Sequence, residues 1–210
     1  MYLPPHFAET RPEQLHRIIN DHPLGMMVTH TAAGLEAQHI PFLLDPAQGP
    51  HGVLLAHVAR ANTVWQEVVS GDAVLVVFRG VEGYISPNWY PGKHDTHRRV
   101  PTWNYEVVHA HGTVHVHDDE KFLRGLVARL TRVHEATQPV PWKMGDAPPD
   151  YLAAMLGKIV GLEVRITRLD GKRKLNQHHE ARDRAGAIQG LETQGHAGLA
   201  QAMRNASHGR

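Results

Sequence analysis

The chain has 210 residues, of which 41% are hydrophobic and 20% are charged, and this composition is that of a globular domain. It excludes a disordered chain, a coiled coil and a collagen-like repeat. Cysteine is absent, which excludes disulfides, thiolate metal sites and a cysteine nucleophile, and 22 basic against 21 acidic residues exclude a global basic field for nucleic acid.

No segment reaches the roughly 20 apolar residues that a membrane-spanning helix needs. The longest apolar run, at 73–78, has the length of a strand. The first residues lack the basic and then apolar pattern of a secretory signal, so we expect a soluble, cytoplasmic protein.

The first half of the chain predicts one helix and several short strands. Thr10 and Glu13 have the spacing of a capping box, which predicts a helix that starts at Thr10 and ends before Pro23. Asn62 is placed to cap a second, short helix. Strand-like runs follow one another along this half, with a hairpin between the first two, at 25–30, 35–40, 52–58 and 73–78.

The middle of the chain combines a long loop with one clearly alternating strand. Residues 82–105 are rich in aromatic residues, proline and glycine and carry the basic run Lys93–Arg99, which predicts a functional loop. Residues 107–117 alternate between apolar and polar positions, which predicts a strand with one buried face.

The last third predicts mainly helices. Asp118 or Asp119 caps a helix with an apolar stripe, a short helix covers 149–157, and a strand covers 159–168. The tail has a helical pattern up to Leu191 and becomes polar beyond it, where we expect it to fray. We therefore divide the chain into a barrel domain at 1–178, with a helical insertion at about 119–157, and a helical tail at 179–210.

Many short strands with late helices predict a mostly β fold, an antiparallel Greek-key-like barrel with flanking helices. No glycine-rich phosphate loop or dinucleotide signature follows a strand, so the phosphate of any ligand needs side chains. Nucleophile-elbow and zinc-hydrolase motifs are absent as well.

Four segments together resemble the FMN-binding negative transcriptional regulators, the PaiB family. The opening Met1–Pro4 and the tripeptide His39–Pro41 add to the resemblance, which runs to about residue 190. Asn88 stands where the family often has Ser, and Asn176-Gln177-His178 stands where it has a Ser-Gln-Asn run. The four segments are His57-Val-Ala-Arg-Ala-Asn62, Gly83-Tyr-Ile-Ser-Pro-Asn-Trp-Tyr-Pro91, Val100-Pro-Thr-Trp-Asn-Tyr105 with Val108-His109, and Lys172-Arg-Lys-Leu-Asn-Gln177.

This resemblance implies an FMN-binding split β-barrel, usually a homodimer with the flavin near the subunit interface, and a role in repression. FMN needs cations for its phosphate, polar groups for the edge of its isoalloxazine ring, and flat apolar surfaces for the ring itself. The motifs supply all three.

We expect Arg60 to bind the phosphate, assisted by the helix start at Asn62, with Lys174 as a second cation. His57 belongs to the same motif. The aromatic side chains expected to face the ring are Trp89, Tyr90, Trp103 and Tyr105, and those expected to bond its edge are Thr102, Asn104 and Gln177.

Each of these residues also has a structural interpretation. Arg60 is equally consistent with a surface cation, Asn62 with a simple cap, and the tryptophans with core or dimer-interface residues. Residues 172–174 read most simply as a solvated run of charge.

The polar face of the alternating strand carries four imidazoles, from His109, His111, His115 and His117. Two close pairs of histidines suit a zinc, copper or nickel ion, but no third ligand is fixed by the sequence. A polar barrel face or a dimer surface is the favoured alternative, and we assign no metal.

We therefore predict a cytoplasmic homodimer that binds FMN and acts as a negative transcriptional regulator. The alternatives are an FMN-dependent oxidoreductase that passes hydride between a nicotinamide or other donor and a small acceptor, and a haem-binding or metal-binding split barrel. DNA is a possible partner, although no helix-turn-helix can be placed and the only basic candidates are 93–99 and 165–174.

Overall fold

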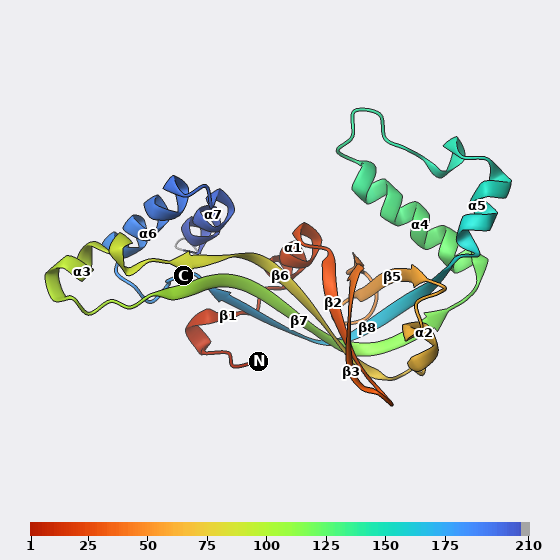
Figure 1. Ribbon diagram of the computed structural model, residues 1–210, viewed down its shortest axis with the longest axis horizontal. Helices are drawn as coiled ribbons and strands as arrows, with labels where there is room; N and C mark the ends of the chain where they lie inside the picture. Colours follow the sequence, from red (N-terminus) through yellow and green to blue (C-terminus); the bar gives the residue numbers. More distant parts are fainter. Residues whose placement is uncertain (207–210) are drawn as a thin grey trace. The chain divides into compact units, whose positions relative to one another are not determined.

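The computed structural model describes residues 1–206 (Figure 1). Its strands are β1 (Ala8–Glu9), β2 (Leu24–Thr31), β3 (Gly34–Pro41), β4 (Leu43–Asp45), β5 (Val53–Ala59), β6 (Ala73–Ile85), β7 (Thr102–His117) and β8 (Ile159–Lys174). Its helices are α1 (Pro12–Asp21), α2 (Val64–Glu67), α3 (Pro91–Thr96), α4 (Glu120–Glu135), α5 (Pro149–Leu156), α6 (Ala181–Thr193) and α7 (Ala197–Asn205).

The strands form a sheet in the order β3-β2-β6-β7-β8-β5-β4, with β1 added to β8. β2 pairs antiparallel with β3 and β6, and β5 pairs antiparallel with β4 and β8. Within residues 1–206 the end strands β3 and β4 do not pair with each other, so the sheet stays open. A mostly antiparallel sheet with flanking helices confirms the predicted fold class.

The chain divides into two compact units that are each built from separated segments. Unit 1 comprises Met1–His22, Phe78–His109 and Asp170–Arg210, and unit 2 comprises Pro23–Val77 and Ala110–Leu169. The long strands β6, β7 and β8 contribute residues to both units. The boundary expected at residue 178 remains a prediction, and residues 207–210 of the expected tail lie outside the described residues.

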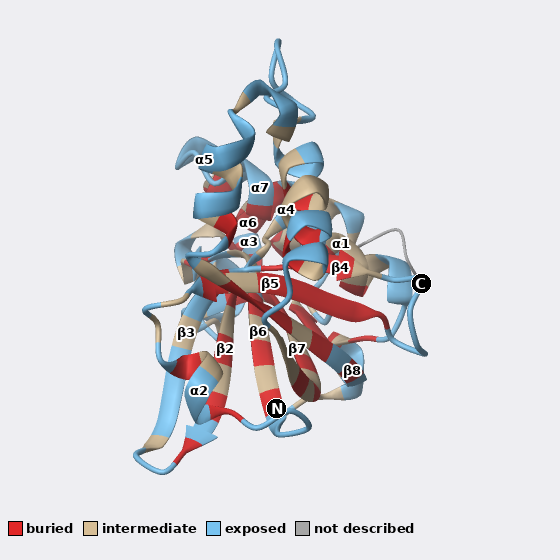
Figure 2. Ribbon diagram, turned by 90° about the vertical axis from the view of Figure 1, so that its right-hand side faces the viewer, coloured by how far each residue is buried: buried red, intermediate tan, exposed pale blue. Residues whose placement is uncertain are grey.

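Unit 2 packs β5 against α4. Val53 and Leu55 of β5 form a buried cluster with Leu126 and Leu130 of α4, and Figure 2 shows β5 as an almost continuous buried strand. The α4 helix begins where the sequence predicts, because the Asp119 side chain accepts a hydrogen bond of 2.8 Å from the Phe122 amide. The hairpin of β2 and β3 is also confirmed, with Thr31 opposite Gly34.

Unit 1 packs its two C-terminal helices onto the end of the sheet and onto the segment that follows it. The α6 and α7 helices lie side by side (Figure 1). Their core includes Ile85, Leu175, Leu191, Leu199 and Met203. The expectation that the chain frays beyond Leu191 is wrong, because Leu199 and Met203 are four residues apart and share one buried face of α7.

Two further expectations need correction. The N-cap of α1 is Arg11 and not Thr10, because Pro12 occupies the first turn and the Glu9 carboxylate accepts the Arg11 amide at 3.1 Å. The segment 82–105 is only partly a loop. β6 continues to Ile85, α3 covers half of the basic run, and β7 already begins at Thr102.

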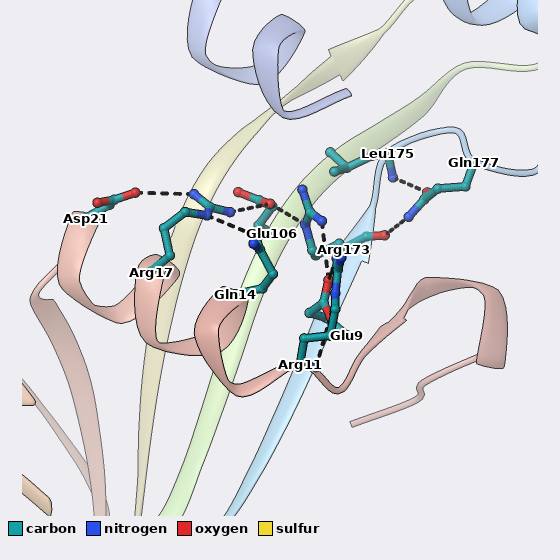
Figure 3. A network of polar contacts seen from close by, with 9 residues as sticks. All are labelled: Glu9, Arg11, Gln14, Arg17, Asp21, Glu106, Arg173, Leu175 and Gln177. Carbon is teal, nitrogen blue, oxygen red and sulfur yellow. Dashed lines mark hydrogen bonds and ion pairs between the residues drawn. The ribbon is translucent and has the colours of Figure 1, made fainter. Parts of the chain in front are cut away.

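A buried network of charges joins the parts of unit 1 (Figure 3). Arg173 of β8 donates to Glu106 of β7 at 2.6 Å and lies 3.3 Å from Glu9 of β1. All three side chains are at most 7% exposed. Arg17 of α1 reaches Glu106 at 3.0 Å, and Arg11 bonds Glu9 at 2.9 Å. The network therefore links β1, α1, β7 and β8 through ionic contacts.

We expect Arg173→Met to lower the free energy of unfolding by about 3–5 kcal/mol, because it leaves two buried carboxylates without their central cation. Arg165→Met on the same strand is the matched control, since Arg165 is 60% exposed in its ion pair with Glu163, and about 0–1 kcal/mol is expected there. Urea denaturation of the three proteins measures the difference. Equal losses for both variants would contradict a special role for the buried network.

The same network predicts a loss of stability in acid. Burial by itself raises the pKa of Glu9, but hydrogen bonds from Arg11, its charge and a hydrogen bond from Arg173 outweigh burial and lower the pKa from 4.5 to about 2. The stability that ionised Glu9 contributes is therefore complete above pH 4.5 and is lost as the pH falls toward 2. Between pH 6 and pH 3 we expect the wild type to lose about 2 kcal/mol more than Glu9→Gln. Parallel pH profiles of the two proteins would contradict this.

Candidate functional site

The residues predicted to hold FMN fall into two groups, one in each unit. Unit 2 holds the three residues of the first motif, His57, Arg60 and Asn62. Unit 1 holds the other eight, which are Trp89, Tyr90, Thr102, Trp103, Asn104, Tyr105, Lys174 and Gln177.

Arg60 follows β5 and already has a complete set of partners. Its Nε donates a hydrogen bond to the Gly157 carbonyl at 2.8 Å, and its Nη2 donates to the Ile159 carbonyl at 3.2 Å. Both terminal nitrogens also donate to the Asp118 carboxylate. The hydrogen bonds from Arg60 lower the pKa of Asp118. The forked face that suits a phosphate is thus occupied by a carboxylate.

Asn62 acts on its own surroundings. Its Oδ1 accepts from the Val64 amide at 3.0 Å, and its Nδ2 donates to the Gln38 side chain at 3.1 Å. The helix it precedes, α2, has only four residues. The N-cap of α2 is therefore Thr63 and not Asn62, whose side chain stabilises the turn just before the helix, and so short a helix gives little support to a phosphate.

His57 has an unsatisfied ring nitrogen. Its Nδ1 is buried and has no hydrogen-bond partner within residues 1–206, and burial lowers the pKa of the ring. The imidazole is therefore neutral at pH 7 and keeps one polar atom available. Buried polar atoms normally find a partner, so this atom is a candidate contact for a ligand.

Trp89 and Tyr90 both belong to the core of unit 1. Trp89 lies against α6, where a Cβ atom on Gly190 would be 2.3 Å from its indole ring, so only glycine fits there. Tyr90 is 1% exposed, and its hydroxyl accepts a hydrogen bond of 2.9 Å from Asn176. Neither side chain offers an open flat face, which favours the structural interpretation of both.

Trp103 and Tyr105 are more accessible. Trp103 is 56% exposed and meets the ring of Tyr84, itself 46% exposed, edge to face at 6.3 Å. Tyr105 is half-buried, and the Lys172 ammonium lies 5.4 Å from the centre of its ring. The flat apolar surface that the site needs is therefore available on the early part of β7.

The three polar residues expected at the ring edge have different surroundings. Asn104 is fully buried and donates to the Met203 sulfur at 3.4 Å, while its Oδ1 has no partner within residues 1–206. Gln177 closes a turn by donating to the Arg173 carbonyl and accepting the Leu175 amide at 2.7 Å. Thr102 accepts a hydrogen bond from Lys174. Asn104 thus has one unpaired atom inside the core of unit 1, whereas Gln177 stabilises the turn after β8.

Lys174 has no acidic partner among residues 1–206. Its one hydrogen bond goes to Thr102, and burial, together with the neighbouring charge of Lys172, lowers its pKa despite an opposing effect of Tyr105. The family motif points to this lysine in the run 172–174. Sequence reasoning gave no binding role to its neighbours His6, Arg98, His178 and His179, although Arg98 lies in the basic run 93–99 and His178 in a segment shared with the family.

The histidine face does not gather into a metal centre. Within residues 1–206 no group of three or more potential ligand side chains is found. Separate partners hold the imidazoles of unit 2: His111 contacts Arg168, His115 contacts Thr113, and His117 stacks on Phe122. Among residues 1–206, no helix is long and apolar enough to span a membrane.

The sequence matches a known family over most of its length. Residues 1–168 match the model of the family described as "putative FMN-binding domain". An uncharacterized protein of Aspergillus fumigatus is 33% identical over 240 aligned residues, which cover 93% of this chain and 92% of the relative. The Bacillus subtilis protein named protease synthase and sporulation protein PAI 2 is 27% identical over 195 residues, covering 92% and 90% of the two chains.

Solved structures show the same fold at low sequence identity. The flavocytochrome Anf3 of Azotobacter vinelandii superposes with a TM-score of 0.59 at 12% identity, over 80% of this chain and 69% of its own. An FAD and heme binding protein of Mycobacterium smegmatis gives a TM-score of 0.54 at 16% identity, over 86% and 79% of the two chains. The chain therefore belongs to the FMN-binding domain family, has the split-barrel fold, and uses FMN as its cofactor.

Proposed function

We propose that the protein is a negative transcriptional regulator that binds FMN as a homodimer in the cytoplasm. The support is the set of motifs shared with the FMN-binding negative regulators and the similarity to the B. subtilis protein. FMN supplies reversible electron transfer when bound. A regulator of this kind responds to the occupancy or the redox state of its flavin.

The observation that carries the cofactor site is a set of buried polar atoms without partners. His57 Nδ1 and Asn104 Oδ1 are both buried and unsatisfied within residues 1–206. A bond from a ligand to either atom would offset the cost of burying that atom. We assign the flavin ring to Trp103 and Tyr105, which share one face of β7; Thr102 and Asn104, predicted at the ring edge, alternate onto the other face of the strand.

The phosphate is assigned to Arg60. Its guanidinium already binds a forked, two-oxygen anion in Asp118, and a phosphate presents the same geometry. Arg60 would hold the phosphate in place of the Asp118 carboxylate, and its contacts to the Gly157 and Ile159 carbonyls would keep the guanidinium oriented. Asn62 fixes the backbone just beyond Arg60.

The homodimer is supported by apolar side chains exposed on unit 1. Tyr84, Val100 and Trp103 are 46%, 75% and 56% exposed, and all three lie within the segment 83–105 that shares motifs with the family. Gathered aromatic side chains of this kind are typical of protein interfaces. A two-fold dimer is the commonest arrangement that covers such a surface.

Arg60→Ala is expected to weaken FMN binding about 10- to 100-fold, the usual range for a hydrogen bond to a charged group, and to leave riboflavin binding nearly unchanged. Asp118→Asn is expected to strengthen FMN binding, because it removes most of the attraction that competes for the guanidinium. Fluorescence titration of both flavins against both variants measures this. Equal changes for FMN and riboflavin would show that Arg60 serves the fold alone.

The regulatory role is tested by selection from a library of random DNA duplexes on the immobilised protein, with and without bound FMN. Enrichment of one sequence by only one of the two forms is expected, together with a dimer in analytical ultracentrifugation. Riboflavin-loaded protein is the control for the phosphate. Failure of both forms to enrich any sequence, combined with steady oxidation of reduced nicotinamide nucleotide, would replace the regulator by the oxidoreductase alternative.

A further inference from the structure

Unit 1 contains a small cavity whose polar lining is almost wholly basic. Its volume is about 340 Å³. The N-terminal segment, the chain between α3 and β7, and the end of β8 with the turn after it all contribute to its wall. The lining residues are His6, Phe7, Arg98, Arg99, Val100, Thr102, Lys174, His178 and His179.

No carboxylate lines this cavity. Within residues 1–206, Arg99 is the one basic residue of the lining with an acidic partner, the buried Asp183 at 2.7 Å, which also accepts the Gly92 amide. Arg98 is exposed, and neither it nor Lys174 forms an ion pair within residues 1–206. The cavity therefore concentrates positive charge that the described part of the chain does not neutralise.

Lys174 is the fixed cation of the cavity. It is half-buried, and its hydrogen bond to Thr102 holds the ammonium against the wall. A half-buried ammonium with a hydroxyl as its one polar partner gains most when an anion approaches, because burial has removed part of its hydration. Arg98 adds a second, mobile charge.

Three imidazoles stand in contact beside this lysine. The ring of His178 lies 5.7 Å from His6 and 4.3 Å from His179, and Phe7 meets it edge to face at 5.3 Å. His179 stacks on the buried ring of Tyr90 at 5.0 Å. Packing therefore holds the rings together before any ligand arrives.

The surroundings of the two histidines after β8 favour their neutral forms in the free protein. Burial lowers the pKa of His178, and the charges of His179, His6 and Lys174 lower it further. Burial also lowers the pKa of His179; Arg99 and Lys174 add to this, while Asp183 alone opposes it. An anion in the cavity reverses the electrostatic part of these shifts.

We propose that this cavity binds the phosphate group of a small ligand and that binding adds a proton to His178, His179 or both. Phosphate suits the lining because it accepts several hydrogen bonds and carries up to two negative charges. The proposal rests on the lining of this cavity alone, although Thr102 and Lys174 were also predicted to contact FMN. Its ligand is either a second phosphorylated molecule or the phosphate of FMN itself.

Isothermal titration calorimetry with sulfate tests the charge chemistry, because sulfate keeps its double charge between pH 6 and pH 8. Sulfate is expected to bind more tightly at pH 6 than at pH 8. If the bound anion raises the pKa of one imidazole by one unit between these two pH values, the affinity changes up to about tenfold. Proton uptake, measured in buffers of different ionisation enthalpy, is expected at pH 7. Inorganic phosphate is the second probe.

Variants locate the site. Arg98→Ala is expected to weaken sulfate binding severalfold and, being an exposed change, to leave folding intact; Lys174→Met is expected to weaken it about 10- to 100-fold. His178→Gln with His179→Gln is expected to remove the pH dependence. Arg132→Ala and His134→Gln on the exposed side of α4 are the matched controls and are expected to change nothing.

Repeating the titration on protein saturated with FMN or riboflavin identifies the source of the phosphate. Unchanged sulfate binding in both cases supports a second ligand, whereas a block by FMN alone assigns the cavity to the flavin phosphate. The proposal is overturned if sulfate does not bind, if its binding is independent of pH, or if the Lys174 and Arg98 variants bind it as strongly as the wild type. FMN binding itself is measured separately, so a failure of the flavin proposal is recognised on its own.

Discussion

The contact of Arg173 with Glu106 and Glu9 is the interaction on which unit 1 depends. A guanidinium that is 7% exposed is tolerated only because two carboxylates surround it, and these carboxylates are in turn held by Arg11 and Arg17. This contact also determines the positions of neighbouring residues. Arg173 fixes the end of β8, so its neighbours Lys172 and Lys174 are fixed as well, one beside the ring of Tyr105 and the other in the basic cavity.

The two cations that we propose as anion-binding groups have opposite electrostatic surroundings. Arg60 has its charge matched by Asp118, so an incoming anion must compete with a carboxylate that is already in place. Lys174 has no matching charge within residues 1–206, so an incoming anion only has to replace water. The first arrangement favours selectivity for a strong, forked anion, and the second favours sensitivity to pH and to small oxyanions.

The sequence was sufficient to predict the fold class because the signals for it are local. The hairpin of β2 and β3, the cap at Asp119 and the alternation of β7 all follow from a few adjacent residues. The lengths of β6, β7 and β8 could not be predicted, because their outer parts mix charged, aromatic and glycine residues whose burial depends on α6 and α7.

The candidate site was predicted less well, for a similar reason. Tyr90 and Trp103 look alike in the sequence, yet one is 1% and the other 56% exposed. The run 172–174 resembles a solvated stretch of charge, and only the distant Glu9 and Glu106 show that its central residue is buried. Contacts between residues that are far apart in the chain carry no signal within a short window.

The same long separation has a consequence for synthesis on the ribosome. Glu9 and Arg173 are 164 positions apart, and the α6 and α7 helices that complete the core of unit 1 come later still. Glu9 and Glu106 can therefore contact Arg173 only after most of the chain has emerged from the ribosome. Unit 1 gains its native contacts late, while most of unit 2 is already available for pairing. A nascent chain that stalls before β8 lacks Arg173 and the two helices that complete the core of unit 1, which is a natural point for chaperones or proteases to act.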